Sequence, residues 1–197
     1  MSGLHPVYPL RTERLDLRPH RMDDLDDLVA FHSDPEVVRY VPWPVRDREQ
    51  TRVALEAKLT QDRLTEEGQW LVLAIELRET KTVIGEVLLK WASAADQTGE
   101  LGYALHAGHQ GKGLASEAAQ EIVRLGFEEL GLHRIVAILD DRNTASAQLV
   151  ERLGMRREAH HLQAWRLKDE WCNEFVYALL KNEWISGRSG SAASDQD

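Results

Sequence analysis

The segment Gln110-Gly111-Lys112-Gly113-Leu114-Ala115 separates a predicted strand from a predicted helix and decides the fold. The strand covers residues 100–105 and the helix covers 116–130. A helix N-terminus leaves about four backbone N–H groups without intrahelical partners and carries partial positive charge, so it favours phosphate oxygens. Gly111 and Gly113 can take positive φ and let a ligand approach the backbone closely. We therefore predict a cradle for an anion such as a pyrophosphate, with an ordinary glycine-containing turn as the alternative.

The spacing of the glycines weakens two other interpretations. The GxxxxGK[ST] and GxGxxG patterns are both absent, which argues against nucleoside triphosphate and dinucleotide sites. No GxSxG elbow supports a hydrolase triad either.

Composition limits the class of protein. The 197 residues are 43% hydrophobic and 29% charged, an ordinary balance for one globular domain. A formal net charge of −9 argues against nonspecific nucleic-acid binding. Residues 1–10 lack the pattern of a signal peptide, no apolar run approaches the length of a membrane span, and the single cysteine, Cys172, fits a reducing compartment. We expect a cytoplasmic protein without nucleic-acid or membrane partners.

Hydrophobic periodicity predicts alternating helices and strands. We expect helices over 22–31, 47–67, 116–130 and 143–153, and strands over 12–18, 70–77, 82–91, 100–105, 135–139, 155–165 and 171–179. Residues 1–185 form one predicted domain. Residues 186–197 are rich in Ser, Gly and Asp and are predicted to be a disordered tail.

Several segments share the order and spacing of one enzyme family. They are Leu10-Arg11-Thr12-Glu13-Arg14-Leu15, Gly99-Glu100-Leu101-Gly102-Tyr103, the turn at 110–115, Asn143 and Ser146 ahead of Glu151-Arg152-Leu153-Gly154-Met155, and Tyr177-Ala178-Leu179-Leu180 before Glu183-Trp184. Over about residues 10–184 the chain resembles the GCN5-related N-acetyltransferases (GNAT), and within them the RimJ/RimL-like branch of ribosomal-protein-alanine N-acetyltransferases. The resemblance implies an α/β (α+β) GNAT fold. Its sheet would be mixed and mostly antiparallel, with about six to seven strands, two splayed central parallel strands, and helices on both faces.

The resemblance also implies acetyl-CoA as the cosubstrate, bound where strands 100–105 and 134–139 splay apart. The pantetheine arm would lie along the first strand and bond to the backbone of Tyr103 and Leu105. Asn143 would also bind pantetheine, with a plain helix N-cap as the alternative. The pyrophosphate-binding residues implied by the resemblance are Gln110, Gly111, Lys112, Gly113, Leu114, Ala115 and Ser116.

Acetyl transfer to an amine needs a neutral amine, a stabilised oxyanion and a proton for the departing thiolate. The resemblance implies Glu100 as the base, acting directly or through water, and a surface carboxylate is the alternative. The oxyanion donor would be a backbone N–H near Leu105. Many relatives have a proton-donating tyrosine after Leu149, where this chain has Val150. Ser146 is therefore the candidate acid, unless it is only a residue of the helix start.

Trp43 lies between two prolines, in the segment that lines the acceptor side in the resembling branch, and is the candidate residue of the substrate pocket. No metal is expected, because His160 and His161 have neither an HxxxH helix nor a cysteine partner.

The branch implies a protein N-terminal amine as the acceptor. A small amine, such as a polyamine, an aminoglycoside-like compound or a hydrazide drug, is the alternative, because one fold serves many acceptors. A non-catalytic acyl-CoA-binding module is an alternative of another class. A homodimer through the C-terminal strands would cover a sheet edge.

Overall fold

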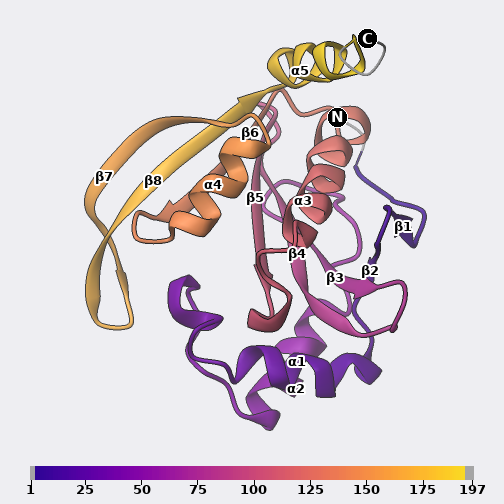
Figure 1. Cartoon of the computed structure of the whole chain (residues 1–197), viewed down its shortest axis with the longest axis vertical. Helices are drawn as coiled ribbons and strands as arrows, with labels where there is room; N and C mark the ends of the chain where they lie inside the picture. The colour runs from indigo at the N-terminus through magenta and orange to yellow at the C-terminus, as the bar shows by residue number, and fades with distance from the viewer. Residues whose placement is uncertain (1–2, 194–197) are drawn as a thin grey trace.

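One mixed sheet organises the chain. The computed structural model describes residues 3–193 (Figure 1). Within them the sheet has eight strands in the order β1-β2-β3-β4-β5-β6-β8-β7, and β5 and β6 form its parallel pair. The strands are β1 (Leu10–Arg11), β2 (Leu15–Pro19), β3 (Trp70–Leu77), β4 (Val83–Ser93), β5 (Thr98–Leu105), β6 (Arg134–Asp140), β7 (Arg156–Leu167) and β8 (Glu170–Leu180). The predicted fold class is confirmed, and the two-residue β1 raises the strand number above the predicted six to seven.

Helices cover both faces of the sheet (Figure 1). The α-helices are α1 (Leu25–His32), α2 (Arg48–Lys58), α3 (Leu114–Arg124), α4 (Thr144–Arg152) and α5 (Lys181–Ala193). Short 3-10 turns η1 (Met22–Asp24), η2 (Val38–Tyr40) and η3 (Ala107–His109) and the π-helical turn η4 (Leu125–Glu129) join them. Leu101 of β5 belongs to the main core with Ala118 and Ile122 of α3. Ala74 of β3 packs with Leu28 of α1 in a second core on the other face.

Strands β5 and β6 pair over a short length only. Their parallel register begins at Thr98 and Arg134 and ends at Glu100 and Val136, although β5 continues to Leu105. Beyond this point β6 keeps pairing with β8, and β5 keeps pairing with β4. Within the described residues, the end of β5 therefore has an edge without a strand partner on the β6 side. This is the splay that the sequence resemblance implied.

The second helix ends earlier than the prediction of 47–67, because α2 stops at Lys58. The chain after it pairs with the N-terminal segment: Leu64 and Leu4 exchange backbone hydrogen bonds of 2.7 and 3.0 Å. These bonds use backbone groups that a continuing helix would pair internally.

The predicted tail over 186–197 differs from the structure in its first part, because α5 extends to Ala193. Arg188 lies over the Trp184 ring, with 4.7 Å from Cζ to the ring centroid, and forms an ion pair with Glu128 at 3.1 Å. Apolar patterning does not reveal such contacts of a polar helix. Residues 194–197 lie outside the described part, and a domain over 1–185 stays a prediction.

Candidate active site

The predicted anion-binding turn has the backbone conformation that its glycines permit. Gly111 and Gly113 have φ of 73° and 77°, which side chains with a Cβ rarely adopt. Gly113 is the N-cap of α3 and makes no side-chain cap. The Gln110 side chain donates to the Leu105 carbonyl at 2.9 Å, and Lys112 Nζ donates to the Gly108 carbonyl at 2.8 Å. The turn thus joins η3, which follows β5, to the start of α3.

The N–H groups of this turn are open to a ligand. Glu117 is the first residue of the segment whose N–H bonds into the helix, to the Gly113 carbonyl at 3.0 Å. Within the part of the chain that the structure describes, the N–H groups of 111–116 have no hydrogen-bond acceptor. Unpaired N–H groups at a helix start carry partial positive charge, so an anion would satisfy them.

Arg14 fixes the turn against α3. Its Nη1 donates to the Lys112 carbonyl at 2.9 Å, and its Nε contacts a Glu117 carboxylate oxygen at 2.7 Å. Thr12 also donates to Glu117, at 2.5 Å. Burial alone would raise the pKa of Glu117, but the hydrogen bonds from Thr12 and Arg14 outweigh it and hold the pKa below its ordinary value. The segment before β2 therefore orders the turn through an ionised Glu117.

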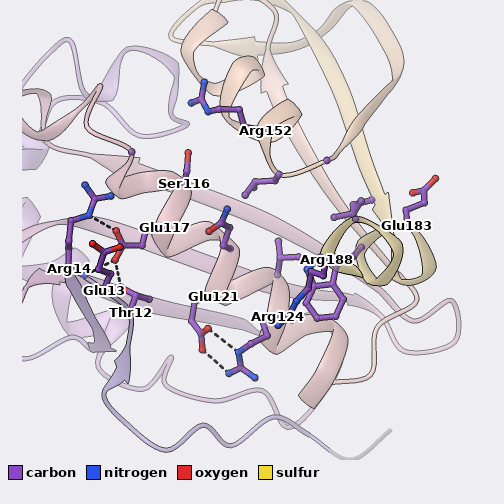
Figure 2. A pocket seen from close by; sticks show the side chains of 18 of the residues that line it. Thr12, Glu13, Arg14, Ser116, Glu117, Glu121, Arg124, Arg152, Glu183 and Arg188 are labelled. Atoms are coloured by element: carbon purple, nitrogen blue, oxygen red, sulfur yellow. Dashed lines mark hydrogen bonds and ion pairs between the residues drawn. The ribbon is translucent and has the colours of Figure 1, made fainter. Parts of the chain in front are cut away.

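A groove of about 940 Å³ starts at this turn and crosses the outer surface of α3 (Figure 2). Ser116 of α3 and Arg152 of α4 lie on opposite sides of it in this view. Arg124 in the groove is neutralised by three glutamates, whereas Arg152 has no ion pair with any described residue. Arg152 is thus a cation without an ion pair among the described residues, beside the anion cradle; the sequence analysis placed it in a matching segment but predicted no role for it in the site.

Glu100 lies at the end of the β5–β6 pairing and is half-buried. Burial raises the pKa of its carboxyl above the ordinary value; the positive charge of Lys90 opposes this shift and the negative charge of Glu174 adds to it. A raised pKa makes a carboxylate a stronger base. Ala104 packs against the core beneath α1 and α2. Glu100 is four residues away on the same strand, so its side chain lies on the same face of the sheet.

Tyr103, Asn143 and Ser146 come together across the splay. The Asn143 Oδ1 caps α4 by accepting the Ser146 N–H at 3.1 Å, which leaves the amide NH₂ for another partner. The Tyr103 hydroxyl donates to the Ser146 carbonyl at 3.2 Å. Burial raises the pKa of the Tyr103 phenol to about 12, so it stays protonated at neutral pH.

The phenol of Tyr103 is a polar group that the sequence reasoning missed, since only the backbone of this residue was predicted to act. Strand alternation was the available signal. It places Tyr103 on the face of Leu101 and Leu105, toward α3 and α4.

Trp43, the predicted pocket residue, lies in a different part of the same face as Glu100. Its ring is 6.0 Å from the His32 ring, 5.3 Å from Arg46 Cζ and 5.9 Å from Lys58 Nζ. No hydrogen bond or ring contact among the described residues joins Trp43 to Glu100.

His160 and His161 each pair with a single carboxylate. His160 contacts Asp141 and His161 contacts Glu174, both at 2.9 Å. Among the described residues, no group of three or more His, Cys, Asp or Glu side chains is arranged to hold a metal ion.

Comparison with known proteins agrees with this geometry. A family model described as the acetyltransferase (GNAT) domain matches residues 14–156. The uncharacterized N-acetyltransferase p20 of Bacillus licheniformis is 35% identical over 176 residues, covering 89% of this chain and 97% of its own. The uncharacterized N-acetyltransferase YnaD of Bacillus subtilis is 31% identical over 175 residues, covering 89% and 98%. The chain therefore belongs to the GNAT acetyltransferase family, and it is an N-acetyltransferase.

Similarity to the ribosomal-protein branch is more limited. The ribosomal protein uS5-alanine N-acetyltransferase of Escherichia coli is 32% identical over 88 residues, which cover 45% of each chain. A crystal structure of a GNAT-family acetyltransferase from Bacillus anthracis superposes with a TM-score of 0.78 at 29% identity, covering 87% of this chain and 98% of its own. A structure of the ribosomal L7/L12 acetyltransferase RimL with coenzyme A has a TM-score of 0.74 at 19% identity, covering 90% and 97%, and shares the fold.

No described helix combines the length and the apolar character needed to cross a membrane.

Proposed function

We propose that this enzyme transfers an acetyl group from acetyl-CoA to the N-terminal amine of a protein, directly and within a ternary complex. The observation that carries the proposal is the continuity of three features. The open N–H groups of 111–116 lead through Leu105 to the unpaired edge of β5, and the half-buried Glu100 lies at the other end of that edge.

The residues of this path fit acetyl-CoA. The N–H groups at the start of α3 would hold the pyrophosphate, and Arg152 stands across the groove as a further cation (Figure 2). The backbone of Tyr103 and Leu105 would bond pantetheine as an added strand does, and the free Asn143 amide would assist. When bound, acetyl-CoA supplies an activated acyl group as a thioester.

The residues at the splay would then move the protons. Glu100, with its raised pKa, would take a proton from the acceptor amine, directly or through water, so that the nitrogen can form its bond to the acetyl carbon. The tetrahedral oxyanion formed by this addition would then collapse: the carbon–sulfur bond would break, the departing thiolate would take a proton, and the new amide nitrogen would release its extra proton to water. Ser146 is the proposed donor, and the phenol of Tyr103 lies beside it, hydrogen-bonded to its carbonyl. Backbone N–H groups near Leu105 would stabilise the oxyanion.

The acceptor class is inferred from relatives. One relative is a ribosomal protein uS5-alanine N-acetyltransferase, and one structural neighbour is a ribosomal L7/L12 α-N-protein acetyltransferase. We assign a protein N-terminus to this chain on that similarity. The alternative acceptors are polyamines, aminoglycosides and hydrazides.

A thiol-release assay separates these acceptors. Acetyl-CoA is supplied with peptides that begin with Ala, Ser or Met, or with spermidine, an aminoglycoside or a hydrazide. Release with the peptides alone supports the proposal, and release with a small amine alone overturns the assigned acceptor. Bound acetyl-CoA without release in any mixture would favour a non-catalytic acyl-CoA-binding module.

A further inference from the structure

The face of the sheet that carries Glu100 also holds a buried group of charged and polar side chains beneath α1 and α2. At its centre is Glu86 of β4, which is 2% exposed and pairs in register with Ala74 and Ala104. Ala74 belongs to the second core with Leu28 and Leu55, and Ala104 packs against that core. The side chains around the Glu86 carboxylate come from the residue after β2, from α1 and α2, and from the chain between the two helices: His20, His32, Trp43, Arg46 and Lys58. We call this set the Trp43 cluster.

Glu86 is already neutralised within the cluster. Lys58 Nζ forms an ion pair with its carboxylate, and the His20 ring nitrogen Nε2 lies 3.8 Å away. Burial would raise the pKa of Glu86, but the charges of Lys58 and His20 outweigh it and keep the carboxyl ionised. Asp24, the other acid near His20, accepts two hydrogen bonds from Arg18, at 2.7 and 2.9 Å. Neither acid is available to a further cation.

The cluster has more hydrogen-bond donors than acceptors. The Trp43 Nε1 and both ring nitrogens of His32 are buried and have no hydrogen-bond partner among the described residues. Burial, followed by the positive charges of Lys58 and Arg46, lowers the pKa of His32 to about 4, so its neutral ring offers one N–H donor at neutral pH. Buried donors without acceptors are uncommon and costly in native structures.

Arg46 adds a cation to these donors. Its guanidinium lies 5.3 Å from the centroid of the Trp43 ring and has no ion pair or side-chain hydrogen bond within the described part of the chain. Arg46 is only partly buried, so its guanidinium is within reach of a molecule at the surface; the Trp43 side chain is also partly exposed, although its Nε1 is buried. A free guanidinium, an unpaired indole N–H and a neutral imidazole form a set that an anionic oxygen group would satisfy.

We propose that the Trp43 cluster binds a carboxylate of the acceptor and so selects N-terminal segments with an acidic side chain near the fourth residue. This inference rests on the proposed function, which places the reacting amine at Glu100. Ala104, the register partner of Glu86, is four residues from Glu100 along β5. At about 3.3 Å per residue this separation is about 13 Å, which an extended peptide also spans in about four residues.

The test uses paired peptide amides, Ala-Ala-Ala-Glu-Ala and Ala-Ala-Ala-Gln-Ala, which differ only in the charge at position four. One charge-assisted hydrogen bond in a partly buried site corresponds to about tenfold or more in kcat/KM. The wild-type enzyme is expected to prefer the Glu peptide by this factor. Arg46→Gln should reduce the ratio to about one. Arg48→Gln is the matched control, because Arg48 is 63% exposed and pairs with Asp26 on the surface, and it should keep the preference.

A second measurement does not depend on turnover. The indole N–H resonance of Trp43, assigned by its loss in Trp43→Phe, is followed while either peptide is added to the ¹⁵N-labelled protein with CoA. The Glu peptide should shift this resonance and the Gln peptide should not.

The outcomes separate the site from the proposed function. Acetylation of both peptides at equal rates, or a preference retained in Arg46→Gln, overturns the site and leaves the function intact. A selective indole shift without acetylation of any peptide supports the site and overturns the function. If no peptide is acetylated and the indole resonance does not shift, both the site and the function are overturned.

Discussion

Replacing Gly113 with glutamate tests the anion cradle, and Gly131→Glu is its matched control. Both glycines have φ of 77°. A Cβ at Gly113 would lie 3.5 Å from the Arg14 guanidinium, and one at Gly131 would meet nothing within 4 Å, so neither substitution forces a clash. The left-handed conformation should cost each variant about 1–2 kcal/mol of unfolding free energy. Both variants also gain one negative charge.

The two variants should differ in acetyl-CoA affinity. A carboxylate about 6 Å from a phosphate charge, at an effective dielectric constant of about 20, is repelled by about 2–3 kcal/mol. Binding to Gly113→Glu should therefore weaken by about 30- to 150-fold. Gly131 follows η4 at the far end of the helical segment from the cradle, so Gly131→Glu should bind acetyl-CoA as the wild type does.

Isothermal titration calorimetry with acetyl-CoA gives the dissociation constants, and thermal unfolding gives the stabilities. The cradle is supported if both variants lose a similar amount of stability and only Gly113→Glu loses affinity for acetyl-CoA. Equal dissociation constants for the two variants would refute it, because the substitutions are matched in strain and in charge.

Four further changes test the rest of the site and the Lys58–Glu86 pair. Glu100→Gln should lower kcat/KM without changing acetyl-CoA affinity. Burial raises the pKa of Glu100, Lys90 lowers it and Glu174 raises it, with a net rise. Wild-type activity should therefore rise with pH through a pKa above the ordinary carboxyl value. Glu174→Gln removes a negative charge and should move this acidic limb to lower pH, and an unmoved limb would exclude the coupling. Ser146→Ala should lower kcat and leave acetyl-CoA affinity unchanged, as measured by turnover and calorimetry; an unchanged kcat would remove Ser146 from the proton transfer. Lys58→Met leaves the buried Glu86 carboxylate unpaired and should cost about 3–5 kcal/mol in denaturant unfolding; a loss below about 1 kcal/mol would contradict the importance of this pair.

Local patterns predicted the parts of the fold that depend on local chemistry. The strand at 70–77 was predicted with its observed bounds, and the glycines at 111 and 113 do adopt the positive φ that the turn requires. Asn143 caps α4 as its residue type favours. These features depend on neighbouring residues in the chain, so the sequence carries their signals directly.

The features that depend on distant contacts were not predictable in this way. The end of α2 is set by pairing of Leu64 with Leu4, and no residue in between signals a stop before Gly68. Glu86 lies in a strand whose two faces are both covered by helices, so alternation cannot tell a buried carboxylate from an exposed one. The partners that make Glu86 tolerable, Lys58 and His20, come from other elements.

The most direct test of the central claim is mass spectrometry of a peptide beginning with Ala, incubated with the purified protein and acetyl-CoA, while thiol release is followed in the same sample. We predict one acetyl group on the N-terminal amine for each thiol released, with little of either product in Glu100→Gln. Binding of acetyl-CoA without acetylated peptide, or acetylation confined to a lysine side chain, would contradict the account.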